Sequence, residues 1–133
     1  MNTKENIKKI IIKKPLTLDC GKTINNYPLA YETYGNLNEK KDNAILVFHA
    51  LSGDQFVTGI NPITNKSGWW SCLVGHNKAI DTNKFFVICA NVIGGCMGSY
   101  GPSYIEPSTS KRLDTNFPAV SYTHLTLPTN REV

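Results

Sequence analysis

The feature that most constrains this chain is an apolar run that passes directly into a loop of small residues. Ala44 to Phe48 is continuously apolar, which predicts a β-strand covered on both faces of a sheet. His49-Ala-Leu-Ser-Gly-Asp54 follows, and its small residues let another molecule approach the backbone. In an open α/β sheet, ligands bind beyond the carboxyl ends of the strands. The pattern therefore predicts either backbone N–H groups offered to a substrate oxygen or a tight turn that merely leaves the strand.

The rest of the pattern predicts an α/β fold built on a mixed sheet. Leu16 to Tyr34 is expected to form two short antiparallel strands, because Leu29 to Tyr34 alternates between apolar and polar positions. Phe85 to Ala90 is a second continuously apolar run and predicts another buried strand, parallel to the first. The stretch from Gly68 to Asp81 predicts a short helix between them. Antiparallel entry strands followed by parallel central strands favour a sheet with helices on both faces.

Charge and hydropathy exclude several classes of partner. The formal net charge is +4, and much of it lies in a lysine-rich leader at residues 1–14 rather than on a basic face interleaved with aromatic residues. We therefore expect no nucleic-acid partner. No apolar run approaches the roughly 20 residues that cross a bilayer, and Ile10-Ile11-Ile12 is too short for a signal-peptide core. The expected location is the cytoplasm, with no membrane partner.

The sequence gives little support for a metal site or for a catalytic serine–histidine dyad. The cysteines show neither Cys-x-x-Cys pairs nor histidines at zinc spacing, which favours reduced structural thiols over a redox or metal role; they are Cys20, Cys72, Cys89 and Cys96. Ser52 lacks the flanking glycines of a G-x-S-x-G nucleophile elbow. His49 ends an apolar strand and is expected to be a hydrogen-bonded packing residue. We reject these two residues as a catalytic dyad.

Two further segments keep alternative interpretations. The glycine-rich stretch from Asn91 to Ser103 matches neither phosphate-binding spacing, so it is either the rim of an active site or an irregular structural loop. Trp69-Trp70 is either a shelf for a base or sugar or a pair that packs a helix against the sheet.

Taken together, segments spread along the chain are similar to the amino-terminal third of the homoserine O-acetyltransferases, enzymes of methionine biosynthesis with the α/β-hydrolase fold. The resemblance runs from about Pro15 to Pro118. The similar segments, in order, are Leu29–Gly35, His49–Asp54, Gly68–Trp70, Lys78–Thr82, Phe85–Cys89, Asn91–Cys96, Gly98–Ser103 and Asp114–Pro118.

The resemblance implies an acyltransferase that works in two steps. A serine takes the acetyl group from the co-substrate acetyl-CoA, and the hydroxyl of L-homoserine then takes it from the serine, with no bound cofactor and no metal. The backbone N–H of Leu51 would serve the oxyanion hole. Ser52, Gly53, Gly94 and Gly95 are expected at the rim of the active site. The family's members pair as homodimers through inserted helices that lie beyond this chain.

The resemblance also implies what this chain does not contain. The family's serine lies in a Gly-Gly-Ser-Met-Gly-Gly elbow, and its aspartate and histidine follow later. No segment here is similar to that elbow, so the triad lies beyond the chain end and the fragment is expected to be inactive. The segment from Gly94 to Gly101 is closer to the acetyl type, although Tyr100 stands where the family has threonine.

Other functions remain as alternatives. Enzymes of the same fold use succinyl-CoA as donor, accept serine, or transfer the acyl group to water. A non-catalytic interaction module that ends naturally at Val133 is a reading of a different class.

The last residues depart from the family pattern. Residues 15–119 are expected to be the amino-terminal part of an α/β-hydrolase domain, and 120–133 a non-native tail. The residues from Val120 to Thr129 match the translation of a transposase sequencing adapter, GTC TCT TAT ACA CAT CTG ACG CTG CCG ACG. His124 is therefore no candidate for catalysis. The nucleotide sequence tests this, since any other codons across Val120 to Thr129 would exclude an adapter origin.

Overall fold

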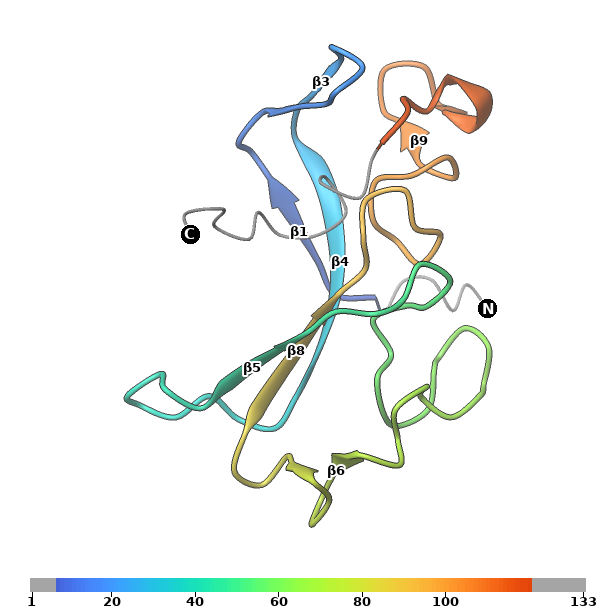
Figure 1. Ribbon diagram of the computed structural model, residues 1–133. Helices are drawn as coiled ribbons and strands as arrows, with labels where there is room; N and C mark the ends of the chain where they lie inside the picture. Colours follow the sequence, from blue (N-terminus) through green and yellow to red (C-terminus); the bar gives the residue numbers. More distant parts are fainter. Residues whose placement is uncertain (1–6, 121–133) are drawn as a thin grey trace. The chain divides into compact units, whose positions relative to one another are not determined.

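The computed structural model describes residues 7–120, so residues 121–133 of the expected non-native tail lie outside the described residues. The chain forms two compact units (Figure 1). Of the described residues, the first unit holds 7–8 and 31–90, and the second holds 9–30 and 91–120. The strand β4 (Tyr27–Tyr34) contributes to both units.

A mixed sheet forms the first unit. Tyr31–Tyr34 of β4 pairs antiparallel with β8 (Phe86–Ala90), and β5 (Ala44–Val47) lies parallel to β8 on its other side (Figure 1). The parallel register sets Leu46 opposite Ile88. An antiparallel strand next to a parallel pair is the arrangement that the sequence predicts, so the mixed sheet is confirmed.

The apolar core of this unit covers only one face of β5. Its buried members are valines and a cysteine, against which larger side chains pack: Val47, Val57, Val74, Val87 and Cys89, with Tyr34, Ile45, Trp70 and Ile80. On the opposite face, Leu46 is 44% exposed and Phe48 is 52% exposed. The expectation that both faces of this strand are covered is therefore wrong for residues 7–120. A second face is normally buried by helices, and these residues form no α-helix.

The helix expected between Gly68 and Asp81 is also wrong. Val74 N–H donates to Trp70 O at 3.0 Å, which is a single helical turn that does not continue. Gly75 has φ +151° and Asn77 has φ +56°, and neither conformation fits an α-helix. The segment instead forms β6 (Val74–Gly75) and β7 (Ile80–Asp81), which pair in parallel.

The second unit begins with a strand inside the expected leader. β1 (Lys9–Ile12) pairs antiparallel with the first half of β4, with Lys9 opposite Ala30. Residues 9–12 therefore belong to a sheet and not to a solvated leader. β2 (Leu16–Thr17) pairs with β3 (Thr23–Ile24), so the strand at Leu29 to Tyr34 has partners other than the one expected.

Small elements complete the second unit. β9 (Ile105–Glu106) pairs antiparallel with β10 (Lys111–Arg112), and the 3-10 helix η2 (Asp114–Asn116) follows. The apolar core consists of Leu18, Ile24, Tyr27 and Ile93, with further apolar side chains packed against it. Across residues 7–120, no helix has the length and apolar character needed to span a membrane.

The buried thiol on β8 gives a chemical test of this core. All four cysteines are free, and only Cys89 is buried. Burial, with the negative charge of Asp54 nearby, raises the pKa of the Cys89 thiol to about 12. At pH 8 only about one molecule in 10⁴ would carry the reactive thiolate. We expect iodoacetamide to leave Cys89 unmodified in the native complete protein and to modify it in urea, as read by mass spectrometry. Equal rates in the two conditions would contradict the buried position.

Candidate functional site

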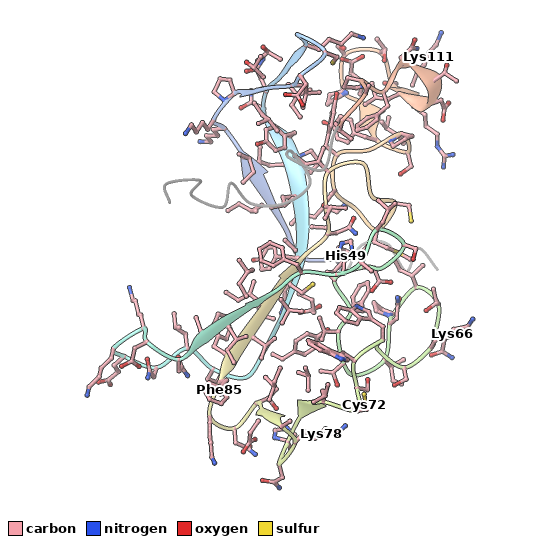
Figure 2. The ribbon with its side chains drawn as sticks, in the orientation of Figure 1. His49, Lys66, Cys72, Lys78, Phe85 and Lys111 are labelled. Carbon is pink, nitrogen blue, oxygen red and sulfur yellow. The ribbon has the colours of Figure 1, made fainter. Side chains whose placement is uncertain are left out.

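The candidate site begins where β5 leaves the sheet. Figure 2 shows His49 at this end of the parallel pair and Phe85 at the other end, where β8 begins. His49 is 8% exposed, and its Nδ1 atom lies 2.7 Å from the backbone oxygen of Ala50. Since a carbonyl oxygen only accepts, Nδ1 donates in this contact. The expectation of a hydrogen-bonded packing histidine is confirmed, and this ring nitrogen cannot act as the base for Ser52.

The loop itself is a β-turn with two central residues. Gly53 N–H donates to Ala50 O at 2.8 Å, which places Leu51 and Ser52 at the centre of the turn. The N–H groups of central residues have no acceptor within a β-turn. Across residues 7–120, no group accepts a hydrogen bond from Leu51 N–H, and the Leu51 side chain is 66% exposed. The turn therefore presents a backbone donor at the carboxyl end of a parallel strand.

Gly53 allows the turn to fold closely onto the strand end. A Cβ atom at this position would lie 3.1 Å from the Cβ atom of His49 and 3.2 Å from Ala50 O. A larger residue here would push the turn away from His49. Gly53 thus has a local structural reason to be glycine. The place of Ser52 and Gly53 at the rim of an active site remains a prediction.

Asp54 fixes the chain just beyond the turn. Its Oδ1 atom accepts from Phe56 N–H at 2.8 Å, and Oδ2 accepts from the side-chain amide of Asn61 at 3.1 Å. Its backbone oxygen accepts from Trp69 Nε1–H at 2.9 Å. Sequence reasoning missed these roles. An aspartate side chain commonly accepts a hydrogen bond from the backbone N–H two residues later, so the sequence could have indicated the contact with Phe56. It could not have indicated the contacts with Asn61 and Trp69.

The tryptophan pair is held by a close approach of two segments. Gly68 N–H donates to Gly59 O and Trp70 N–H to Val57 O, each at 2.8 Å. The two indole rings stack at 5.5 Å, and Trp70 packs against the apolar core. A Cβ atom at Gly68 would lie 2.4 Å from the backbone nitrogen of Thr58, so glycine is required for this approach. Trp70 therefore packs against the core, as the packing interpretation expects, but it does so from a segment that is not a helix.

The glycine-rich segment belongs to the second unit, whereas Leu51, Ser52 and Gly53 belong to the first. Gly94 has φ +91°, a conformation that favours glycine. A Cβ atom at Gly95 would lie 2.5 Å from the Asn91 side-chain oxygen. These contacts explain both glycines as parts of a tightly packed loop. Their place at an active-site rim stays a prediction.

Two side chains tie this segment to β4. The Ser99 hydroxyl accepts from Ala30 N–H at 2.9 Å and donates to Asn91 O at 2.5 Å. The Tyr100 ring packs 5.0 to 6.4 Å from other aromatic rings, which are Tyr27, Tyr104 and Phe117. Tyr100 is thus part of an aromatic cluster in the core of this unit, which gives this tyrosine a structural reason independent of the acyl donor.

Replacing Ser99 tests how much this tie contributes. Ser99→Ala removes the acceptor of the buried Ala30 N–H and the donor to Asn91 O. We expect a loss of about 1–3 kcal/mol in the free energy of unfolding, measured by urea denaturation of the complete protein. Ser103→Ala, at an exposed serine of the same segment, is the matched control and should change stability by less than about 0.5 kcal/mol. Equal effects would show that the two hydrogen bonds do not matter.

No group of three or more histidine, cysteine, aspartate or glutamate side chains within residues 7–120 could hold a metal ion. The other described histidine, His76, has Nδ1 at 2.8 Å from the side-chain oxygen of Asn83.

Comparison with known proteins gives the following matches. No protein-family model matches the chain. A curated homoserine O-acetyltransferase of Pelagibacter ubique is 74% identical over 121 residues, which is 91% of this chain and 32% of that protein. The solved homoserine O-acetyltransferase from Bacillus anthracis has a TM-score of 0.71 and 36% identity, over 90% of this chain and 33% of that one.

A solved hydrolase is equally similar in structure. Esterase E22 has a TM-score of 0.71 and 31% identity, over 90% of this chain and 34% of that one. The expected α/β-hydrolase fold class is confirmed by these solved neighbours. The chain spans about a third of the length of each of these three proteins.

Proposed function

Since the chain belongs to the homoserine O-acetyltransferase family, an acyltransferase family, we propose that the complete protein transfers an acetyl group from acetyl-CoA to the hydroxyl of L-homoserine. The observation that carries this proposal is the 74% identity to a curated homoserine O-acetyltransferase across 91% of the chain. The free Leu51 N–H at the end of β5 supports it, because acyl transfer needs a fixed donor for a developing oxyanion.

In this proposal the described residues supply electrostatic stabilisation. The carbonyl oxygen of the acetyl group gains negative charge as a nucleophile attacks, and Leu51 N–H would donate to it. A donor held in a turn needs no rearrangement when that charge appears. Three groups would come from parts of the complete protein that this sequence does not include. They are the serine that receives the acetyl group, the histidine that takes its proton and the carboxylate that orients the histidine. The acyl-enzyme would divide one hard transfer into two easier ones.

A complete enzyme can be built to test the reaction. Residues 9–118 of this chain would replace the corresponding segment of the Pelagibacter ubique relative, with the unaltered relative as the control. Release of CoA from acetyl-CoA would be followed with L-homoserine, with L-serine and without an acceptor. We expect release that depends on homoserine and is much weaker with succinyl-CoA. Equal release with serine, or a preference for succinyl-CoA, would contradict the proposed acceptor or donor.

Hydrolysis is the second candidate, because esterase E22 matches this chain with the same TM-score as an acetyltransferase does. A hydrolase passes the acyl group to water and would yield acetate whether or not homoserine is present. The ratio of O-acetylhomoserine to acetate at saturating homoserine distinguishes the two. A ratio that stays near zero in the complete enzyme would favour the hydrolase.

The proposal extends to the protein's setting. We place the reaction in methionine biosynthesis and the protein in the cytoplasm, where free thiols such as the four described cysteines stay reduced. The complete protein is proposed to be a homodimer that binds only its small-molecule substrates, with acetyl-CoA as co-substrate and without a bound cofactor, nucleic acid or membrane. Light scattering of the purified complete protein would test the dimer.

A further inference from the structure

We propose that Trp69 is a positioning residue for the Leu51 donor, acting through its hydrogen bond to the backbone oxygen of Asp54. This inference rests on the proposed acyl transfer and names residues that hold the same site. It concerns the first unit alone, which contains all the residues involved.

The turn has few contacts of its own. Leu51 is 66% exposed, and the turn is closed by one backbone hydrogen bond, from Gly53 to Ala50. On the strand side, the buried His49 ring contacts Ala50 O. The position of Leu51 N–H therefore depends on how firmly the chain is held on the other side of the turn, which begins at Asp54.

Asp54 is held by four different groups. Two contact its carboxylate, namely Phe56 N–H and the amide of the buried Asn61. The third is Trp69 Nε1–H, which contacts the backbone oxygen at 2.9 Å. The Cys89 thiol is a weak donor to the same backbone oxygen, at 3.9 Å. The Trp69 contact is therefore the stronger of the two that act directly on the main chain leading back to Leu51.

Trp69 is itself placed rigidly. Its backbone lies in a segment bonded to Gly59 and Val57, and its ring stacks on Trp70, which packs against the core. A partly exposed indole with such support serves to hold its one polar atom in place. Misplacement of a reacting geometry by about 1 Å can lower a rate by as much as about 100-fold. Loss of this contact should therefore reduce turnover more than substrate binding.

The first measurement uses Trp69→Phe in the complete enzyme described above. Phenylalanine keeps an aromatic ring and removes the N–H donor. With p-nitrophenyl acetate as acyl donor, whose reaction does not depend on homoserine, we expect kcat for acylation to fall by about tenfold. KM should stay within about twofold, because the change affects the transition state and not ground-state binding. A change confined to KM, with kcat unaltered, would overturn the inference.

A matched control separates positioning from packing. Trp70→Phe makes the same chemical change in the neighbouring ring, which has no hydrogen bond to Asp54. This variant should lower thermal stability and leave kcat within about twofold. An equal fall in kcat for both variants would assign the effect to the aromatic packing and sink the inference.

A double-mutant cycle identifies the route of the effect. Leu51→Pro removes the donor, so Trp69→Phe should then lower kcat by less than about twofold in the Leu51→Pro background. A tenfold fall in both backgrounds would show that Trp69 does not act through Leu51. If Leu51→Pro alone changes nothing, the proposed oxyanion role fails instead. If acylation responds as expected but homoserine is not acetylated, only the proposed acceptor is wrong.

Discussion

Replacing Leu51 by proline should lower kcat of the complete enzyme by about 10² to 10³, the effect of removing one oxyanion donor. The substitution is conservative for the backbone. Leu51 is the first central residue of its turn and has a negative φ, and this is the position where proline is favoured in β-turns. The change therefore deletes the N–H group while the turn can keep its shape. Steady-state assays with acetyl-CoA and homoserine would measure the loss.

The control at the same position is Leu51→Ala. Alanine keeps the N–H group and removes a side chain that is mostly exposed, so kcat should stay within a few-fold. If Leu51→Ala is as damaging as Leu51→Pro, the side chain and not the backbone carries the role. If neither variant is impaired, this turn is a simple exit from the strand.

Gly35→Ala should produce a large loss of stability in the first unit. Gly35 has φ +76°, and a Cβ atom there would lie 2.2 Å from Phe85 O and 2.6 Å from Thr82 O. Both neighbours are backbone atoms, so the end of β4 would have to move away from the start of β8. We expect a loss of at least about 3 kcal/mol in the free energy of unfolding, measured by urea denaturation of the complete protein.

Gly59→Ala separates backbone strain from the clash. Gly59 has nearly the same φ, +74°, but a Cβ atom there would meet nothing within 4 Å. The substitution should lower stability by about 1–2 kcal/mol, the strain of a left-handed conformation alone. Similar losses for Gly35→Ala and Gly59→Ala would mean that the close approach at Gly35 is absent in solution.

The strands of the mixed sheet could be predicted because they depend on local pattern. The apolar runs at Ala44 to Phe48 and Phe85 to Ala90 form β5 and β8 with little shift. Their burial could not be predicted in the same way. A continuous run indicates two covered faces, but the covering elements are distant in sequence, and Leu46 remains exposed among residues 7–120.

The expected helix failed for a reason that the sequence shows only in part. The apolar residues around Trp69 and Trp70 have no clear period, and the conformations of Gly75 and Asn77 end the single turn. At the site, the small-residue loop indicated a free backbone donor from its composition. The hydrogen bond from Trp69 to Asp54 joins residues 15 positions apart, and no local pattern encodes such a pairing.

The parallel pairing of β5 with β8 has a consequence for the order of events during synthesis. Leu46 and its partner residue Ile88 are 42 positions apart in the chain. At about 5 to 20 residues per second, a ribosome takes roughly 2 to 8 seconds to make that interval. The same delay separates the emergence of β5 from the ribosome and the emergence of β8, and in this interval β5 lacks the strand that pairs with it. We expect nascent chains paused within this interval to be captured by chaperones through Leu46 and Phe48, and release to follow the synthesis of β8.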